Sequence, residues 1–399
     1  MKKKTPGLLH VVPYFDGADA YGGIPRVAAG QVWELSNRGY EVTVCTTDAR
    51  DADRRHPASK KSIMYNKSKV HYFKNMSNGL AYRQIFLPLK GLAWLWDNVC
   101  NFDVVHLHGY RNLLNEVAAT AARKHRIPYV IQANGTVPRI ERKKTVKLLY
   151  DLVIARKTMQ GCSMAIAVSE AERSQYVQAG LDPARVALVP NGLDPAEFKD
   201  LPSRSESRRK LGIGPGEKII AFLGKATPRK GIDTLVKAVS SLKPDYGLRL
   251  VISGSDMGGV KPALQLAARL GIESRIAMLG PVEGKERLSL LVAADVSVYA
   301  GRDEIFGISA FESIMCGTPV IVASDSGCGE WAKKTGCPWL IRPGDAVALA
   351  EWIERILGEP SKAGSTVRLA REFVKRELSW GQVTDSLEKV YIKALEIVA

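Results

Sequence analysis

The sequence lacks the features that mark zinc sites, secreted disulfide frameworks and membrane spans. Its six cysteines form no Cys-x-x-Cys pair, and none of its six histidines has zinc-ligand spacing around them. No stretch approaches the roughly 18 uncharged apolar residues of a spanning helix. The apolar segment near the start, residues 8–12, is too short for a signal sequence. We therefore expect a reduced, cytoplasmic protein with no metal site and no cofactor.

Two familiar nucleotide-binding motifs are also missing. No Gly-x-x-x-x-Gly-Lys-Ser/Thr segment is present, so a Walker A loop is excluded. An NAD-dependent dehydrogenase should show Gly-x-Gly-x-x-Gly after the first strand, and Gly22-Gly23 lacks that spacing. A dinucleotide-dependent redox enzyme is therefore not favoured.

The residues that are present have the balance of a globular protein, with 46% apolar and 25% charged side chains. A chain of 399 residues exceeds the usual size of one core, so two domains are the simplest division. Short apolar runs alternate with amphipathic stretches, which is typical of a parallel α/β fold. We expect strands at residues 8–12, 41–46, 104–108, 129–133, 164–169, 186–190, 218–223, 249–253, 275–279, 295–299 and 319–323.

The turn-rich segment at residues 189–194 is the strongest boundary signal in the chain. A Ser- and Arg-rich stretch follows it before the strand pattern restarts near Lys218. Helical periodicity then occupies residues 347–357 and 366–398, with breaks at Pro360 and Trp380. The hinge between two α/β domains is therefore predicted at this segment, which places the domains at residues 1–192 and from residue 193 onward.

Positive charge is concentrated in the first half of the chain. The net charge is +16, and residues 1–190 hold 28 Lys and Arg against 15 Asp and Glu, or +13. Residues 54–90 carry nine cations and no acid, interleaved with apolar side chains that include Tyr72, Phe73 and Phe86, and Trp94 and Trp96 follow them. A second basic cluster spans residues 139–157. An anionic membrane surface suits this mixture; nucleic acid and a merely solvated face are the competing interpretations.

Two glycine-containing turns follow expected strands, where ligands bind in open α/β sheets. Gly22-Gly23 precedes a helix whose free N–H groups favour a phosphate. In the second turn, Gly224 is followed by Lys225 and Lys230 before a helix near Ile232, and the two cations could clamp a diphosphate. An ordinary loop and a purely structural turn remain the alternatives.

The third turn contains two glutamates, Glu304 and Glu312, around a glycine at an expected helix start. If the helix begins near Phe306, the N–H groups of Gly307 and Ile308 are free to hold a phosphate. Glu304 could then reach sugar hydroxyls, and Glu312 a vicinal diol. The same spacing also fits a helix cap and an exposed side chain.

The third turn resembles the Glu-x7-Glu motif of the retaining glycosyltransferases of family 4. The likeness extends in order along nearly the whole chain. Gly22-Gly23 is similar to the family's N-terminal loop, residues 189–194 to its interdomain joint, residues 224–231 to its phosphate loop, and residues 327–330 to its late Gly-x-x-Glu element. Residues 379–380 lie where the family's closing helix crosses back to the first domain.

This resemblance implies a GT-B architecture, with two Rossmann-like domains whose parallel sheets face each other across a cleft. The first domain would hold the acceptor and take back the closing helix, about residues 380–399; residues 193–379 would hold a nucleotide-sugar donor. By position, Lys225 and Lys230 would neutralise the diphosphate, Glu304 would bind the sugar and Glu312 the ribose. The family also implies retention of configuration without a metal, the leaving phosphate itself taking the acceptor's proton.

Two departures from the family pattern affect site residues. Gly224-Lys225 replaces the usual Gly-Arg. The positive charge is kept, but the paired N–H donors of a guanidinium are absent. Asn134 stands where the family often has a histidine that reaches the donor sugar, and an amide can bind but cannot titrate. His106 and His108 lie on one strand face near the expected cleft, and His108 is a weaker candidate for substrate contact.

Three rival functions remain alongside glycosyl transfer. A nucleotide-sugar 2-epimerase shares the architecture but needs an acid/base array that the sequence does not show. The dehydrogenase lacks its motif, and a basic nucleic-acid-binding protein has only the net charge in its favour. We expect a UDP-sugar donor, with GDP as runner-up. The expected acceptor is a lipid-linked sugar or oligosaccharide of polysaccharide or glycan assembly, used by an enzyme bound peripherally to the inner face of the cell membrane, with no nucleic-acid partner.

Overall fold

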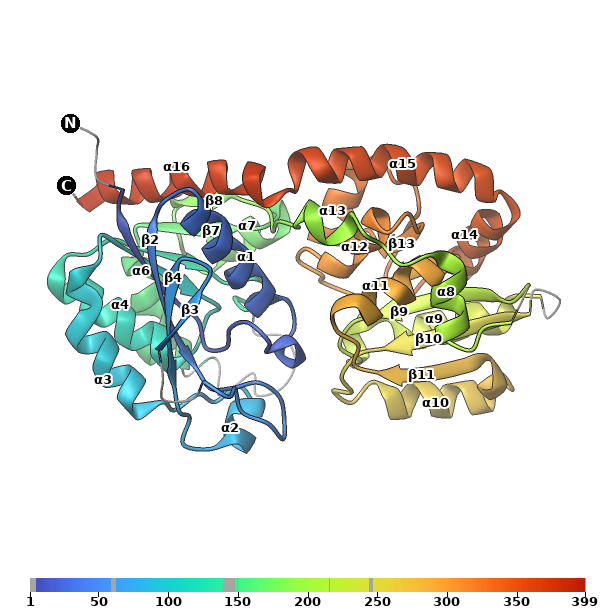
Figure 1. Cartoon of the computed structure of the whole chain (residues 1–399), viewed down its shortest axis with the longest axis horizontal. Helices are drawn as coiled ribbons and strands as arrows, with labels where there is room; N and C mark the ends of the chain where they lie inside the picture. The colour runs from blue at the N-terminus through green and yellow to red at the C-terminus, as the bar shows by residue number, and fades with distance from the viewer. Residues whose placement is uncertain are drawn as a thin grey trace. The chain divides into compact units, whose positions relative to one another are not determined.

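The computed structural model describes residues 5–58, 62–138, 148, 150–214, 216–243 and 247–398. These residues form two compact units. One comprises Met1–Gly192 together with Trp380–Ala399, and the other comprises Leu193–Ser379. Each unit is built around its own sheet with helices on it (Figure 1).

The first unit contains an eight-stranded sheet in the order β3-β4-β2-β1-β5-β6-β7-β8. Its strands are β1 (Gly7–Val11), β2 (Glu41–Thr47), β3 (Ser62–Tyr65), β4 (Ser68–Phe73), β5 (Val104–His108), β6 (Tyr129–Gln132), β7 (Met164–Ala167) and β8 (Val186–Leu188). All neighbours pair in parallel except β3 and β4, which form an antiparallel hairpin. The sequence pattern predicted a purely parallel sheet and did not reveal this hairpin. Asn66 turns it with φ +51°, a conformation that asparagine tolerates.

Two helical layers cover the sheet of the first unit. One layer contains α1 (Gly23–Asn37) and α16 (Trp380–Val398), which contact each other. Helix α1 packs on β2 and β4, and α16 packs on β5, β6 and β7. In the other layer, α3 (Leu89–Asn98), α4 (Leu113–His125) and α6 (Arg156–Gly161) pack together. The remaining helices include α2 (Asn78–Tyr82) and α7 (Glu170–Gln178), of which α7 lies against β7 and β8.

The last helix, α16, belongs to the first unit because its side chains fill that unit. Trp380 lies so close to Gly30 and Gly192 that a Cβ on either glycine would come within 2.4 Å of the indole ring. Arg38 on α1 forms ion pairs with Asp385 and Glu388 at 2.7 and 3.0 Å. The chain thus returns to its first unit at its end.

The second unit contains a six-stranded parallel sheet in the order β11-β10-β9-β12-β13-β14. Its strands are β9 (Lys218–Leu223), β10 (Leu248–Ser253), β11 (Ile276–Gly280), β12 (Val296–Tyr299), β13 (Val320–Ala323) and β14 (Leu340–Ile341). The central strand β9 explains the uninterrupted apolar runs: Ile220 and Phe222 face one core, and Ile219 and Ala221 face the other.

Helices lie on both faces of this second sheet. One layer contains α9 (Ile232–Ser241), α10 (Val260–Arg269) and α14 (Ala346–Gly358), and the other contains α8 (Arg204–Lys210), α11 (Gly284–Ala293) and α12 (Ile308–Met315). Helix α13 (Gly327–Lys334) packs on β13, and α15 (Pro360–Glu377) packs on α12 and α14. Among the helices in the described part of the chain, none has the length and apolarity that a bilayer span requires.

Candidate active site

Two of the predicted site residues, Lys230 and Glu304, meet at the carboxyl ends of neighbouring strands in the second unit. Lys230 ends a short 3-10 turn (Pro228–Lys230) after β9, and Glu304 lies in the loop after β12, the strand that pairs with β9. The Nζ of Lys230 donates to Oε2 of Glu304 and, at 2.8 Å, to the hydroxyl of Tyr299. About a fifth of each charged side chain is exposed, so the pair lies at the surface of a mostly buried site.

The electrostatics of this cluster keep Lys230 positive. Burial by itself lowers the pKa of Lys230, but the neighbouring Glu304 and Tyr299 outweigh burial, and the pKa lies above its ordinary value. Burial, followed by the charge of Glu304, raises the pKa of Tyr299, so its phenol stays neutral. The site thus contains a fixed cation that a carboxylate and a phenol hold in place. Tyr299 was missed in the sequence, where only its place at the end of an expected strand marked it.

Two glycines fix the loops that carry Lys230 and Glu304. Gly231 has φ +70°, and a Cβ there would lie 2.4 Å from the carbonyl oxygen of Ala300. Gly307 has φ +76°, and a Cβ there would lie 2.7 Å from Sγ of Cys328. A side chain at position 231 would therefore push the loop of Lys230 away from the loop after β12, and one at position 307 would push the loop of Glu304 away from α13.

Helix α12 starts at Ile308, with Gly307 as its N-cap, two residues after Phe306, near which the sequence placed the start. The left-handed backbone of Gly307 cannot belong to the helix, and this delays the start by two residues. The first-turn N–H groups that lack helical partners thus begin at Ile308. Phe306 is buried and packs against Phe311 and Trp331, with ring centroids 5.0 and 6.1 Å away. A substrate contact by Phe306 or Gly307 stays a prediction.

The second glutamate, Glu312, is fully buried and forms an ion pair with Arg287 on α11. Arg287 also contacts Glu197, at 2.8 Å. Arg287 could not be predicted as the partner of Glu312, because the two residues lie on separate helices, α11 and α12. A role for Glu312 in holding a ribose diol stays a prediction. Lys225 and Gly224 lie in the turn after β9, where the N–H of Gly224 donates to the carbonyl of Ser253 at 2.9 Å.

In the first unit, the candidates lie where strands end. Gly22, with φ +98°, caps α1, and Gly23 is the first residue of that helix. Asn134 follows β6 with φ +50°, and its amide lies 3.5 Å from the side chain of Gln132. These positions agree with the rule that parallel sheets bind ligands at the carboxyl ends of their strands.

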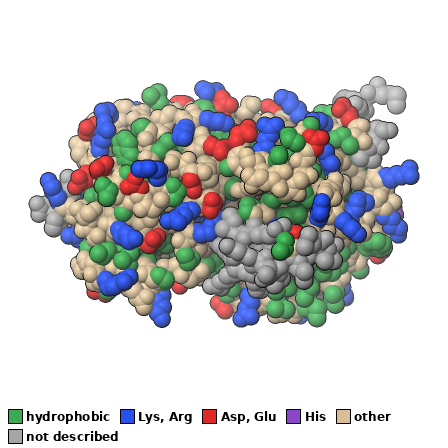
Figure 2. Space-filling view, turned by 180° about the vertical axis from the view of Figure 1, so that it is seen from behind, with side chains coloured by type: hydrophobic (Ala, Val, Ile, Leu, Met, Phe, Trp, Pro, Cys, Tyr) green, Lys and Arg blue, Asp and Glu red, His purple; other side chains and the backbone are tan. Residues whose placement is uncertain are grey.

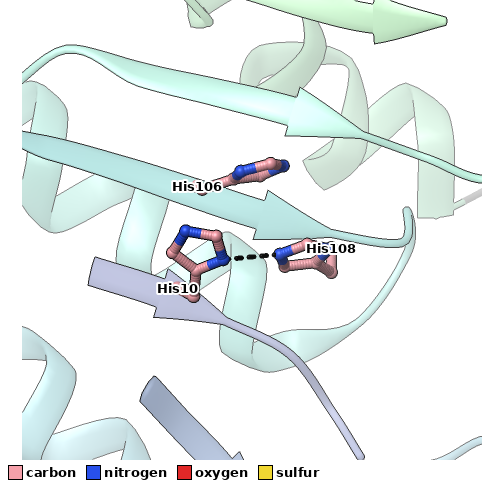
Figure 3. Close-up of side chains that lie close together, drawn as sticks. All are labelled: His10, His106 and His108. Carbon is pink, nitrogen blue, oxygen red and sulfur yellow. Dashed lines mark hydrogen bonds between the residues drawn. The ribbon is translucent and has the colours of Figure 1, made fainter. Parts of the chain in front are cut away.

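His108 ends β5 and joins a buried cluster with His10 on β1 and His106 (Figure 3). His10 Nδ1 lies 3.0 Å from His108 Nε2, the contact that is dashed in Figure 3. The hydroxyl of Tyr391 on α16 lies 2.7 Å from His106 Nδ1 and 3.3 Å from His10 Nε2. Burial lowers the pKa of His10 to about 3 and the pKa values of the other two well below their ordinary value.

These neutral rings could in principle bind a metal, since ligand atoms of all three lie within 4.8 Å of one another. However, His10 already uses both ring nitrogens in bonds to His108 and Tyr391, and the group contains no carboxylate to balance a cation. The arrangement fits a hydrogen-bonded polar core better than a metal site. A substrate contact by His108, which is fully buried, stays a prediction.

Known proteins resemble the chain in both halves. The family model described as glycosyltransferase family 4 matches residues 21–197, and the model described as glycosyl transferases group 1 matches residues 203–373. A D-inositol 3-phosphate glycosyltransferase of Actinosynnema mirum is 31% identical, over 74% of each chain. An uncharacterized glycosyltransferase of Methanocaldococcus jannaschii is 29% identical over 75% of this chain and 77% of its own.

Solved structures show the same fold at lower identity. HepE of Anabaena, in complex with UDP and glucose, has a TM-score of 0.74 at 20% identity, over 96% of this chain and 98% of its own. Sucrose-phosphate synthase of Thermosynechococcus elongatus also has a TM-score of 0.74 at 20% identity, over 98% and 100% of the two chains. Together with the two α/β units, these neighbours confirm the predicted GT-B fold class.

Proposed function

The chain belongs to the group 1 glycosyltransferases, and we propose that it transfers a sugar from a nucleoside diphosphate sugar, with UDP as the preferred nucleotide, and retains the anomeric configuration. One observation carries the proposal: Lys230, Tyr299 and Glu304 converge at the carboxyl edge of a parallel sheet, beside the start of α12. A cation and free helix N–H groups at one edge suit a diphosphate, and an adjacent carboxylate suits sugar hydroxyls.

Each group has a distinct task in this reaction. The bond between the anomeric carbon and the diphosphate breaks, and the diphosphate leaves with the electron pair. Lys230, which stays positive, stabilises the charge that develops on the leaving oxygen. The acceptor's hydroxyl oxygen forms the new bond to the anomeric carbon, and its proton passes to the leaving phosphate. Glu304 accepts hydrogen bonds from the sugar, and Tyr299 orients the ammonium of Lys230.

Exposed residues of the first unit support the proposal that the acceptor is membrane-associated and lipid-linked. Its segment 62–96 presents exposed cations next to exposed apolar side chains; the cations are Lys67, Lys69, Lys74, Arg83 and Lys90, and the apolar residues are Met64, Met76, Ile85, Leu89 and Trp96. Basic and apolar side chains together favour an anionic lipid surface. Two of the aromatic side chains expected at this surface are instead buried: Tyr72, and Phe86, which packs against Tyr14 and Tyr21.

Positive charge does not form one uniform patch on the face turned away from the viewer in Figure 1. On the face drawn in Figure 2, Lys and Arg side chains lie among acidic and apolar ones. Lys60, Lys61 and most of the second basic cluster, residues 139–157, lie outside the described residues. The support for membrane docking therefore comes from the exposed residues of segment 62–96 and from the net charge of the first half.

A phosphorylated acceptor is the second candidate, because the names of several relatives include one. The A. mirum relative is named for D-inositol 3-phosphate, and so are relatives from Rhodococcus jostii and Nocardia farcinica. A basic first unit would attract a small phosphate ester as well as a lipid surface. The two candidates differ in their need for vesicles, so transfer assays with and without them separate the acceptors.

A donor screen tests the proposal directly. We expect UDP and UDP-sugars to raise the melting temperature of the wild type, since a ligand at about 100 times its Kd stabilises by about 2.7 kcal/mol. Lys230→Ala and Glu304→Gln should weaken this effect or abolish donor turnover. Lys237→Ala and Glu273→Gln, at exposed positions of the same unit, are the matched controls. A wild type that no nucleoside diphosphate or its sugar stabilises, and that hydrolyses none of them, would refute the proposal.

A further inference from the structure

A buried carboxylate in the first unit bonds to two separate loops. Glu172 lies in the first turn of α7 and is fully buried. Its Oε2 accepts a hydrogen bond from the N–H of Val168 at 2.8 Å, and its Oε1 accepts one from the N–H of Gly135 at 2.6 Å. One side chain therefore joins the loop after β7 to the loop after β6.

The local sequence suggests only a helix cap at this place. Ser169 and Glu172 have the Ser-x-x-Glu spacing of a capping box, and the side chain of Ser169 accepts from the N–H of Glu172 at 3.3 Å, as the motif requires. In a capping box, however, the glutamate returns to the N–H of the N-cap residue. Here the carboxylate bonds instead to Val168 and, 37 residues away, to Gly135. Capping does not account for the second bond.

Burying the negative charge of Glu172 at this position costs free energy. Burial raises the pKa of Glu172 to about 7, and only the N–H groups of Val168 and Gly135 counteract it. Across the described residues, no charged side chain contributes to this pKa. The titratable group that faces Glu172 is Tyr176, one turn on, which stays neutral because burial raises its pKa well above the ordinary value. Tyr110 and Cys162, from neighbouring elements, act on Tyr176. A neutral glutamine would avoid the cost of burying the charge.

The loop that Glu172 holds is the one that carries Asn134. Asn134 and Gly135 both have left-handed backbone, with φ +50° and +83°. Tyr176 supports the start of this loop, since its hydroxyl accepts from the N–H of Ala133 at 2.7 Å. The bond from Gly135 to Glu172 fixes the residue directly after Asn134. Arg111 holds the carbonyls of Thr136 and Val137 further along the loop, so Glu172 supplies the contact nearest to Asn134 on this side.

We propose that Glu172 is a positioning residue for glycosyl transfer, which holds Asn134 in its substrate-binding orientation only while its carboxylate is ionised. The inference rests on the proposed function, since it takes Asn134 as a substrate contact. An ionised carboxylate accepts from both N–H groups. A protonated one carries a hydrogen on one oxygen, which weakens the bond that this oxygen accepts and loosens the hold on one loop.

Hydrogen exchange on the free enzyme tests the hold on the loop without any substrate. In the wild type at pH 8, the amide of Gly135 should be protected. In Glu172→Gln, whose amide NH2 faces one of the donors, peptides that contain Gly135 should exchange at least about tenfold faster. Glu170→Gln, at an exposed neighbouring position on α7, is the control and should leave exchange unchanged. Equal exchange in wild type and Glu172→Gln overturns the proposal.

The pH dependence of transfer tests the consequence for activity. The wild-type kcat/KM should fall as the pH drops through about 7, which is the pKa of Glu172. Glu172→Gln should lose this acidic limb and have a kcat/KM at pH 8 that is at least about tenfold lower; Asn134→Ala should add little to that loss. If the loop loosens in Glu172→Gln while kcat/KM is unchanged, the positioning role is refuted and the proposed function stands. If the wild type transfers no sugar, both fall.

Discussion

Replacing Glu172 by glutamine should make the first unit more stable at neutral pH, although we expect it to make the enzyme less active. Glutamine has nearly the shape of the protonated acid but never carries its charge. If Glu172 had only a structural role, the substitution would destabilise the protein. If Glu172 keeps a buried charge for function, the substitution should stabilise the protein.

The size of the gain follows from the pKa of Glu172. Burial raises that pKa from 4.5 to about 7, so the folded protein binds the proton more tightly than the unfolded chain does. This tighter proton binding stabilises the folded protein in full below pH 4.5, and the stabilisation is lost as the pH rises through about 7. At about 1.4 kcal/mol for each tenfold change, the loss at pH 8 is about 3 kcal/mol. Glu172→Gln should therefore match the wild type near pH 4.5 and exceed its free energy of unfolding by up to about 3 kcal/mol at pH 8.

Urea denaturation between pH 4.5 and 8.5 measures this difference, provided that the readout reports the first unit. The two units need not unfold together, so hydrogen exchange of peptides from β6 and β7 should define the transition. Wild type and variant share every other titrating group, and their difference therefore isolates Glu172. A gap that does not change with pH, or a variant that is less stable at pH 8, would refute the reasoning and leave Glu172 as an ordinary cap.

Further outcomes follow from the candidate active site and the basic surface. Glu304→Ala should lower kcat, and Glu312→Ala should mainly raise the KM for the donor; effects below about threefold in kcat/KM, or roughly 0.7 kcal/mol, would remove both from the site. Tyr299→Phe, which keeps the ring and removes one bond to Lys230, should lower kcat/KM by about fivefold, and an unchanged value would rule out the orienting role. Activity should survive excess chelator, and a loss that manganese or magnesium restores would contradict the metal-independent mechanism. The wild type should sediment with anionic vesicles and less so at high salt, and binding should be lost when four exposed lysines, Lys67, Lys69, Lys74 and Lys90, are changed to glutamate; a variant that still sediments would leave the segment a solvated face.

The sequence predicted the strands well wherever apolar residues fill both faces of a sheet. Residues 218–223 were expected as a strand and are β9, because alternate side chains of this run enter two cores. The hairpin of β3 and β4 was missed because its exposed lysines interrupt the apolar pattern and were interpreted only as charge. Phe86 was taken for a surface aromatic for the same reason, since a short apolar group in a basic segment does not show which side chains face inward.

The partners of the site residues follow from the order of the strands and could not be predicted from motif spacing. Lys230 and Glu304 are 74 residues apart, and Glu172 and Gly135 are 37 apart. Periodic patterns relate residues two to four positions apart, so they cannot pair such groups. Each pair lies at the carboxyl ends of strands that are neighbours in a sheet, β9 with β12 and β6 with β7. The rule that ligands bind at this edge selected the turns of Lys230 and Glu304, and the structure brings these two residues into contact. Tyr299 and Glu172 could be found only once the sheet order was known, because each contacts a turn that follows a neighbouring strand.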